Sequence, residues 1–305
     1  MRALTAAVAI IIPAGSAFAH GDGDPIDPGD VWHHWSAEPW IVVSLALAFA
    51  LYGCGVWRIW SHAGSGRGIS FSRVTSYALG GATLVVALAS PIDPLGGTLL
   101  SAHMVQHILL IGVAPPLLLA GLPGVALPWS LPKNARRALG RSPGLRKIAG
   151  RSSFLIRPLP AAALHGAALW IWHAPALFEA ALRNEFIHSV EHISFFATAM
   201  LFWQSIAFAA RSATTIPGGI AASFLTLLHG GFLSVLIIFS PALLYPWYQG
   251  TSQLWGLDAL SDQQLAGLIM GVPASFVYLL TCLGLAARLL VPTPAYCEGR
   301  NDASM

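Results

Sequence analysis

Charged residues are scarce in this sequence: only 10% of its 305 residues are Asp, Glu, Lys or Arg, whereas 55% are hydrophobic. A soluble protein of this length needs far more charge to cover its surface. The apolar residues fall into blocks of about 20, the length of helix that crosses a hydrocarbon core about 30 Å thick. The sequence therefore excludes an ordinary soluble domain and predicts an all-α, polytopic membrane helix bundle.

Cysteine is also scarce, with only Cys54, Cys282 and Cys297 and no CxxC pair. This excludes a disulfide framework and a thiolate metal cluster. The sequence has neither GxxxxGK[ST] nor GxGxxG, so a nucleotide-driven pump is disfavoured. We expect no nucleic-acid partner.

The N-terminal residues are typical of an exported protein. Residues 1–19 combine Arg2, a short apolar run and Ala17-Phe18-Ala19, which predicts a cleaved signal peptide. Residues 20–39 are acidic and rich in Gly and Pro, and we expect an exported irregular segment there. If His20 becomes the new N-terminus, its amine and imidazole, with His33 or His34, are candidates for chelating Cu(II).

About seven membrane helices are predicted within residues 40–290, followed by a tail at 291–305. The apolar blocks are 40–58, 73–92, 103–122, 159–178, 187–209, 217–240 and 264–289. Pro115, Pro116 and Pro273 lie inside blocks, and we expect kinks there, which membrane helices tolerate.

Basic residues orient the bundle by the positive-inside rule. If residue 20 is outside and the spans alternate, every Lys and Arg falls inside except Arg183 and the signal-peptide Arg2. The sequence therefore predicts an N-terminus outside and a C-terminus inside. The inner loop at 123–158 carries eight basic residues. We expect this loop to lie on anionic lipid or to bind a partner protein.

Five histidines from three predicted spans lie at one level near the outer face. Ionisable groups at membrane depth are costly and usually functional, and imidazole is the commonest metal ligand. We therefore predict a metal site there, with Met104 as a soft thioether and Asp93, Glu191 and Asp262 as nearby carboxylates. The predicted metal-site residues are His103, His107, His173, His188, His192, Glu191, Met104 and Asp262.

Two narrower patterns keep other functions open. His188-Ser189-Val190-Glu191-His192 matches HxxEH, in which two histidines hold zinc and the glutamate is the base of a membrane hydrolase. His165 and His229 lie deeper, at similar predicted depths, and are candidate axial ligands of a haem.

Several motifs in a fixed order are distinctive. They are Trp35 with Glu38-Pro39, SPIDPLGG at 90–97, SAHMVQHILLIGVAPPLLLAGLP at 101–123, WHAPALFEAALRNEFIHSVEH at 172–192, Phe202-Trp203 and DQQLAGLIMGVP at 262–273. With these motifs the sequence resembles the CtaG-type, multi-span assembly factors of bacterial cytochrome c oxidase. It departs from their pattern at Gly271, where an aromatic residue is expected, and at Glu38, where Asp is expected.

The resemblance implies a non-enzymatic protein of the bacterial inner membrane that helps to mature a haem–copper oxidase. It implies copper as the metal, in the Cu(I) state, oxidase subunits as partners and a copper chaperone as supplier. A metal-free scaffold for oxidase assembly is the alternative. The motif residues carried over are His103, Met104, Gln106, His107, His173, His188, Glu191, His192, Asp262 and Gln263.

Overall fold

The computed structural model describes residues 25–36, 38–144, 147, 150 and 152–290. Within these ranges the chain forms helices and loops, with no strand, so the all-α prediction is confirmed. The predicted signal peptide at 1–19, His20 and the predicted tail at 291–305 lie outside the described residues.

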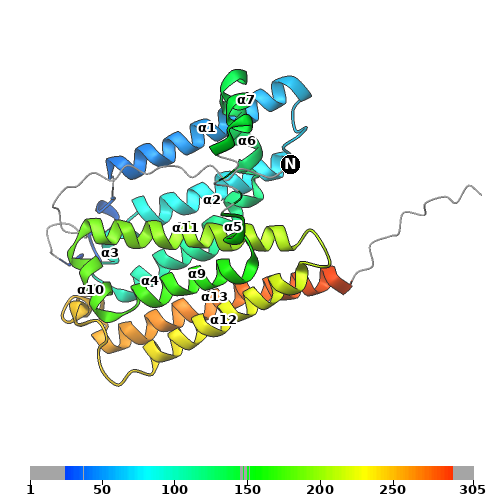
Figure 1. The fold of residues 1–305 in the computed structure, drawn as a ribbon. Helices are drawn as coiled ribbons and strands as arrows, with labels where there is room; N and C mark the ends of the chain where they lie inside the picture. Colours follow the sequence, from blue (N-terminus) through cyan, green and yellow to red (C-terminus); the bar gives the residue numbers. More distant parts are fainter. Residues whose placement is uncertain (1–24, 37, 145–146, 148–149, 151, 291–305) are drawn as a thin grey trace, which may run out of the picture.

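Six helices are long and apolar enough to cross a membrane, and they lie side by side in a bundle (Figure 1). They are α1 (Pro39–Ala63), α2 (Phe71–Ala89), the continuous unit Leu100–Ala120, α11 (Glu185–Ala209), α12 (Ile216–Ile238) and α13 (Ala259–Leu290). The protein is therefore a polytopic membrane protein.

The fourth predicted span, 159–178, is not a single helix. Its first part is α9 (Pro158–Trp172), which has 15 residues and packs beside α11 and α12. The chain then turns and continues as α10 (Pro175–Arg183). Pro175 explains the break, because it lacks an N–H and forces Ala174 into an extended conformation (φ −63°, ψ 126°). Whether α9 makes a seventh span stays a prediction.

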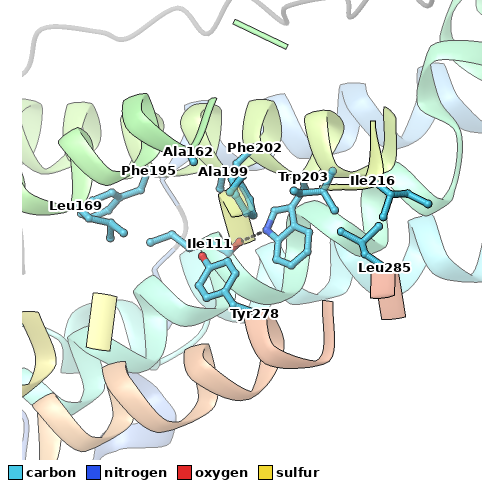
Figure 2. Close-up of a cluster of buried hydrophobic side chains, with 12 residues drawn as sticks. Ile111, Ala162, Leu169, Phe195, Ala199, Phe202, Trp203, Ile216, Tyr278 and Leu285 are labelled. Atoms are coloured by element: carbon cyan, nitrogen blue, oxygen red, sulfur yellow. Dashed lines mark hydrogen bonds between the residues drawn. The ribbon is translucent and has the colours of Figure 1, made fainter. Parts of the chain in front are cut away.

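The unit Leu100–Ala120 has three parts: α4 (Leu100–Ile108), the π-helical turn η2 (Leu109–Val113) and α5 (Ala114–Ala120). Pro115 has no N–H to donate to the carbonyl of Ile111, so regular α-helical bonding fails at the predicted position. Trp203 of α11 supplies the missing donor, with Nε1 2.9 Å from the Ile111 carbonyl oxygen (Figure 2). Across Pro273, by contrast, α13 remains one helix.

Short elements connect the long helices. They are η1 (Val31–His33), α3 (Ile92–Leu95), α6 (Pro123–Ser130), α7 (Lys133–Arg141), η3 (Ser152–Phe154), η4 (Pro246–Tyr248) and η5 (Ser252–Trp255). Figure 1 places α3 and α10 at one end of the bundle and α6 and α7 at the other.

Close packing between α12 and α13 gives a physical reason for Gly271. A Cβ at this position would lie 2.9 Å from the Cβ of Ser234 on α12, closer than real side chains allow. One turn earlier, a Cβ at Gly267 would lie only 2.6 Å from Cγ1 of Ile238. Small residues at helix interfaces let membrane helices approach one another, so an aromatic side chain does not fit here without separating the pair.

One of the hydrophobic clusters of the bundle is centred on α11. Phe202 and Trp203 of α11 pack against Tyr278 of α13, and the Trp203 and Tyr278 rings stack at 9° with centroids 5.8 Å apart (Figure 2). α11 and the unit Leu100–Ala120 are the most buried of the six long helices. Polar residues on these two helices are therefore shielded from lipid.

Candidate metal centre

Two helices, α4 and α11, each carry a pair of histidines one turn apart. The ring centroids lie 4.3 Å apart for His103 and His107 on α4, and 4.0 Å apart for His188 and His192 on α11. The i, i+4 spacing puts both members of each pair on one helix face. These faces oppose each other, with centroids 5.5 Å apart for His103 and His188 and 5.6 Å apart for His107 and His192.

The carboxylate of Glu191 lies at the centre of this arrangement. Its Oε2 is 4.0 Å from Nε2 of His103, and its Oε1 is 3.7 Å from Nε2 of His107. The side chain has 0% exposure, and neither oxygen accepts a hydrogen bond from the described residues. An ionised carboxylate in such a place is very costly unless a cation or a proton compensates its charge.

One set of four side chains has the spacing of a metal site. The ligand atoms of His103, His188, Glu191 and His192 all lie within 4.8 Å of one another, and all four residues are buried. An ion with bonds of about 2.0–2.1 Å holds neighbouring donors roughly 3.3 Å apart in tetrahedral geometry. Small side-chain rotations therefore bring these donors onto one ion.

His173, at the end of α9, adds a further imidazole beside this set. Its ring centroid is 5.9 Å from that of His107. Its Nδ1 is 2.8 Å from the carbonyl oxygen of Leu169, an acceptor only, so Nδ1 carries the proton and Nε2 keeps its lone pair. Nε2 has no hydrogen-bond partner among the described residues. His173 therefore presents a ligating nitrogen without further rearrangement of its proton.

Aromatic side chains close the surroundings of the histidines. Phe195 packs against His107 at 4.8 Å and against His173 at 5.9 Å, and Phe178 packs against His103 at 5.1 Å between ring centroids. Both phenylalanines are fully buried. The low-polarity walls strengthen electrostatic interactions between the centre and any bound cation.

Two predicted ligands have other contacts. Met104 is buried in a hydrophobic cluster that includes Leu100 and Tyr245, so its side chain has a packing role. The carboxylate of Asp262 accepts hydrogen bonds from the backbone N–H groups of Leu100, at 2.7 Å, and Ser101, at 3.2 Å. Neither residue belongs to the group of four.

Gln106 connects α4 to α2 and α3 beside the histidines. Its Nε2 donates to the carbonyl of Ala87, at 2.8 Å, and to Oδ1 of Asp93, at 2.6 Å. Burial raises the pKa of Asp93 to about 6, against the hydrogen bond from Gln106, which lowers it. Asp93 thus ties α3 to α4, a pairing that sequence spacing alone did not indicate.

The deeper histidines do not fit a haem. Nδ1 of His165 is 3.1 Å from Oγ1 of Thr198, and Nε2 is 3.4 Å from the hydroxyl of Tyr278. Both ring nitrogens of His165 are therefore occupied. The ring of His229 lies directly on α9, because a Cβ at Gly166 would be only 2.9 Å from its Nε2. A porphyrin has no place between these residues.

The HxxEH residues do converge, but in a closed environment. His188, Glu191 and His192 are 5%, 0% and 8% exposed. A general base must reach its substrate directly or through one water molecule. In this conformation a polypeptide substrate does not reach Glu191, so the structure gives the hydrolase interpretation no support beyond the clustering itself.

A comparison with protein families identifies the chain. The family described as cytochrome c oxidase caa3 assembly factor (Caa3_CtaG) matches residues 50–291. This chain belongs to that family. The match spans α4, α9 and α11, and so includes all five clustered histidines and Glu191, and the resemblance stated from the motifs is confirmed.

Members of the Caa3_CtaG family assist the assembly of cytochrome c oxidase, as the family description states. Two curated proteins from Mycobacterium bovis and Mycobacterium tuberculosis, each named only as uncharacterized, are 27% identical to this chain over 204 residues. The alignment covers 64% of this chain but only 30% of each relative, so the chain spans about a third of their length. No solved structure matches the chain.

Proposed function

We propose that this protein binds copper at His103, His188, Glu191 and His192 and presents it to a cytochrome c oxidase subunit during assembly in a bacterial inner membrane. The observation that carries the proposal is the buried carboxylate of Glu191, which faces histidines and accepts no hydrogen bond from the described residues. A bound cation compensates this charge directly.

The donor set supports copper as the ion. Three imidazoles and one carboxylate favour a borderline divalent metal, and such sites bind Cu(II) more tightly than other first-row divalent metals. Imidazole also suits Cu(I), the oxidation state expected from the family resemblance. Without thiolate ligands the affinity is moderate, and a protein that hands an ion to a partner needs moderate affinity.

The neighbouring histidines support transfer rather than storage. His107 and His173 lie beside the group of four, and His173 presents Nε2. Additional imidazoles next to a site give an ion alternative ligands as it leaves. We assign the incoming supply to a copper chaperone and the outgoing transfer to an oxidase subunit.

Metal content of the purified full-length protein tests the proposal. The protein is loaded anaerobically with Cu(I) in detergent beside a His103→Ala/His192→Ala variant. A His62→Ala variant is the matched control, because it removes an exposed imidazole outside the cluster. We expect stoichiometric copper in the wild type and the control, and its loss in the first variant.

Two other results contradict the proposal. Copper that survives in the His103→Ala/His192→Ala variant places the metal elsewhere. No retained copper in any of the three proteins favours the metal-free scaffold, in which the clustered histidines only hold the helices together.

A further inference from the structure

Hydrogen bonds from distant segments converge on residues 96–101, which lead into α4. The side chains of Tyr248, Trp247 and Thr251 donate to the carbonyl oxygens of Gly96, Gly97 and Thr98, at 2.8–2.9 Å. The hydroxyl of Thr98 also accepts a hydrogen bond from the backbone N–H of Ile26, at 3.0 Å. The loop between α12 and α13 therefore holds residues 96–98, which lead into α4 and its histidine pair.

Asp262 binds the first turn of α4 itself. The first N–H groups of a helix have no partner within it, and residue Leu99, at the N-cap position of α4, supplies no side-chain acceptor. The carboxylate of Asp262, 162 residues away on α13, accepts from Leu100 and Ser101 instead. Asp262 has 0% exposure, and its negative charge also matches the positive end of the α4 dipole.

The capped turn sets the position of His103. This histidine follows Ser101 by two residues and lies in the first turn of α4. On its other side Gly96 approaches closely, since a Cβ there would be 3.3 Å from Nδ1 of His103. If the first turn of α4 frays, His103 leaves its place opposite His188.

We propose that Asp262 is a positioning residue of the metal centre: it caps α4 from α13 and so holds His103 toward His188 and His192, without binding the ion. The capping role stands on the hydrogen bonds alone, whereas its effect on copper rests on the proposed function. The loop from Trp247 to Thr251 supports the same turn from the other side.

Three variants of the full-length protein separate the two parts of this inference. Asp262→Ala removes both acceptors, and Asp262→Asn keeps one carbonyl oxygen and guards against a variant that fails to fold. Gln264→Ala is the matched control, because Gln264 is an exposed polar residue two positions further along α13.

Hydrogen exchange of the metal-free protein is the first measurement. We expect amide exchange at Leu100 and Ser101 to become at least ~10-fold faster in Asp262→Ala, with a smaller rise in Asp262→Asn and no change in α4 for Gln264→Ala. Unchanged exchange in both Asp262 variants overturns the inference whatever the copper results are.

Copper affinity is the second measurement. We expect Asp262→Ala to bind one copper ion about 10- to 100-fold more weakly, the range found for residues that orient ligands, and Asp262→Asn to lie between it and the wild type. If Asp262→Asn loses copper altogether while its exchange is normal, Asp262 is a ligand and the inference is wrong. If the wild type binds no copper, the proposed function fails, and the exchange result alone decides whether Asp262 caps α4.

Discussion

Glu191 is the side chain on which both the proposed copper site and the hydrolase alternative depend. Its neighbours on α11 are histidines one position later and three positions earlier, and α4 adds His103 and His107 on the facing side. A carboxylate in this position lowers the free energy of a bound cation in a place where water does not screen the charges. The same residue is the candidate base in the hydrolase alternative, so its substitution separates the two functions.

We predict that Glu191→Gln, which keeps the shape of the side chain but removes its charge, weakens copper binding at least ~10-fold. The measurement is copper affinity by competition with a chelator, together with hydrolysis of a fluorogenic peptide by the zinc-loaded wild type. Peptide hydrolysis that disappears in Glu191→Gln while metal affinity stays unchanged contradicts the copper carrier and favours the hydrolase.

A substitution of Met104 tests whether its thioether takes part in the proposed copper site. Because its side chain packs among apolar residues, Met104→Leu is a volume-conserving change that we expect to alter unfolding free energy by less than about 1.5 kcal/mol. Copper stoichiometry should stay that of the wild type. A lost or weakened copper ion would show that the thioether is a ligand after all.

At the scale of elements, the unit Leu100–Ala120 depends on its neighbours for regular structure. Pro115 breaks its hydrogen-bond ladder directly after the segment that carries His107, and Trp203 of α11 satisfies the freed carbonyl of Ile111. At the other end Asp262 of α13 caps the same unit. The hydrogen-bond partners of this unit thus come from α11 and α13, which lie later in the chain. These bonds fix α4 relative to α11.

We predict that Trp203→Phe destabilises the protein by about 1–3 kcal/mol, because the carbonyl of Ile111 loses the indole N–H that donates to it. Thermal unfolding in detergent measures this, with Trp170→Phe on the partly exposed face of α9 as the control. Equal melting temperatures for the two variants would show that the hydrogen bond to the π-helical turn adds nothing to stability.

At the scale of the whole molecule, charge and chemistry lie at opposite ends. The clustered histidines belong to the beginnings of α4 and α11 and the end of α9, near α3 and α10, whereas α7 with Lys133 and Arg137 lies at the other end (Figure 1). The positive-inside rule predicts that the clustered histidines lie toward the outer face. The proposed copper ion would then be accessible to partners on that side of the membrane.

We predict that a cysteine introduced at His34 reacts with a membrane-impermeant thiol reagent in intact cells, whereas one at Arg137 reacts only after the membrane is opened. Both positions are exposed. Cys54 and Cys282 stay in place, and Cys297→Ser is the parent protein for both variants. Labelling in the reverse pattern would show that the bundle has the opposite orientation, with the clustered histidines on the inner side.

Much of this molecule follows from its sequence because membranes impose simple rules. In lipid every backbone polar group needs a hydrogen-bond partner inside the protein, so apolar blocks of sufficient length become helices. This determined the helical bundle, and the i, i+4 spacing determined that His103 pairs with His107 and His188 with His192. The break at Pro175 was not anticipated, since membrane helices often continue across proline, as α13 does at Pro273.

Only the tertiary structure decided which side chains meet. A helical period states that residues share a face but not which other helix that face contacts, because packing partners are chosen by shape along the whole length of both helices. Packing of α11 against η2 and α5 brought His103 to His188 and Glu191, whereas packing of α13 against α4 placed Asp262 at the N-terminus of α4 and left Met104 in an apolar cluster. The sequence by itself supplied the candidate ligands, and the three-dimensional packing selected among them.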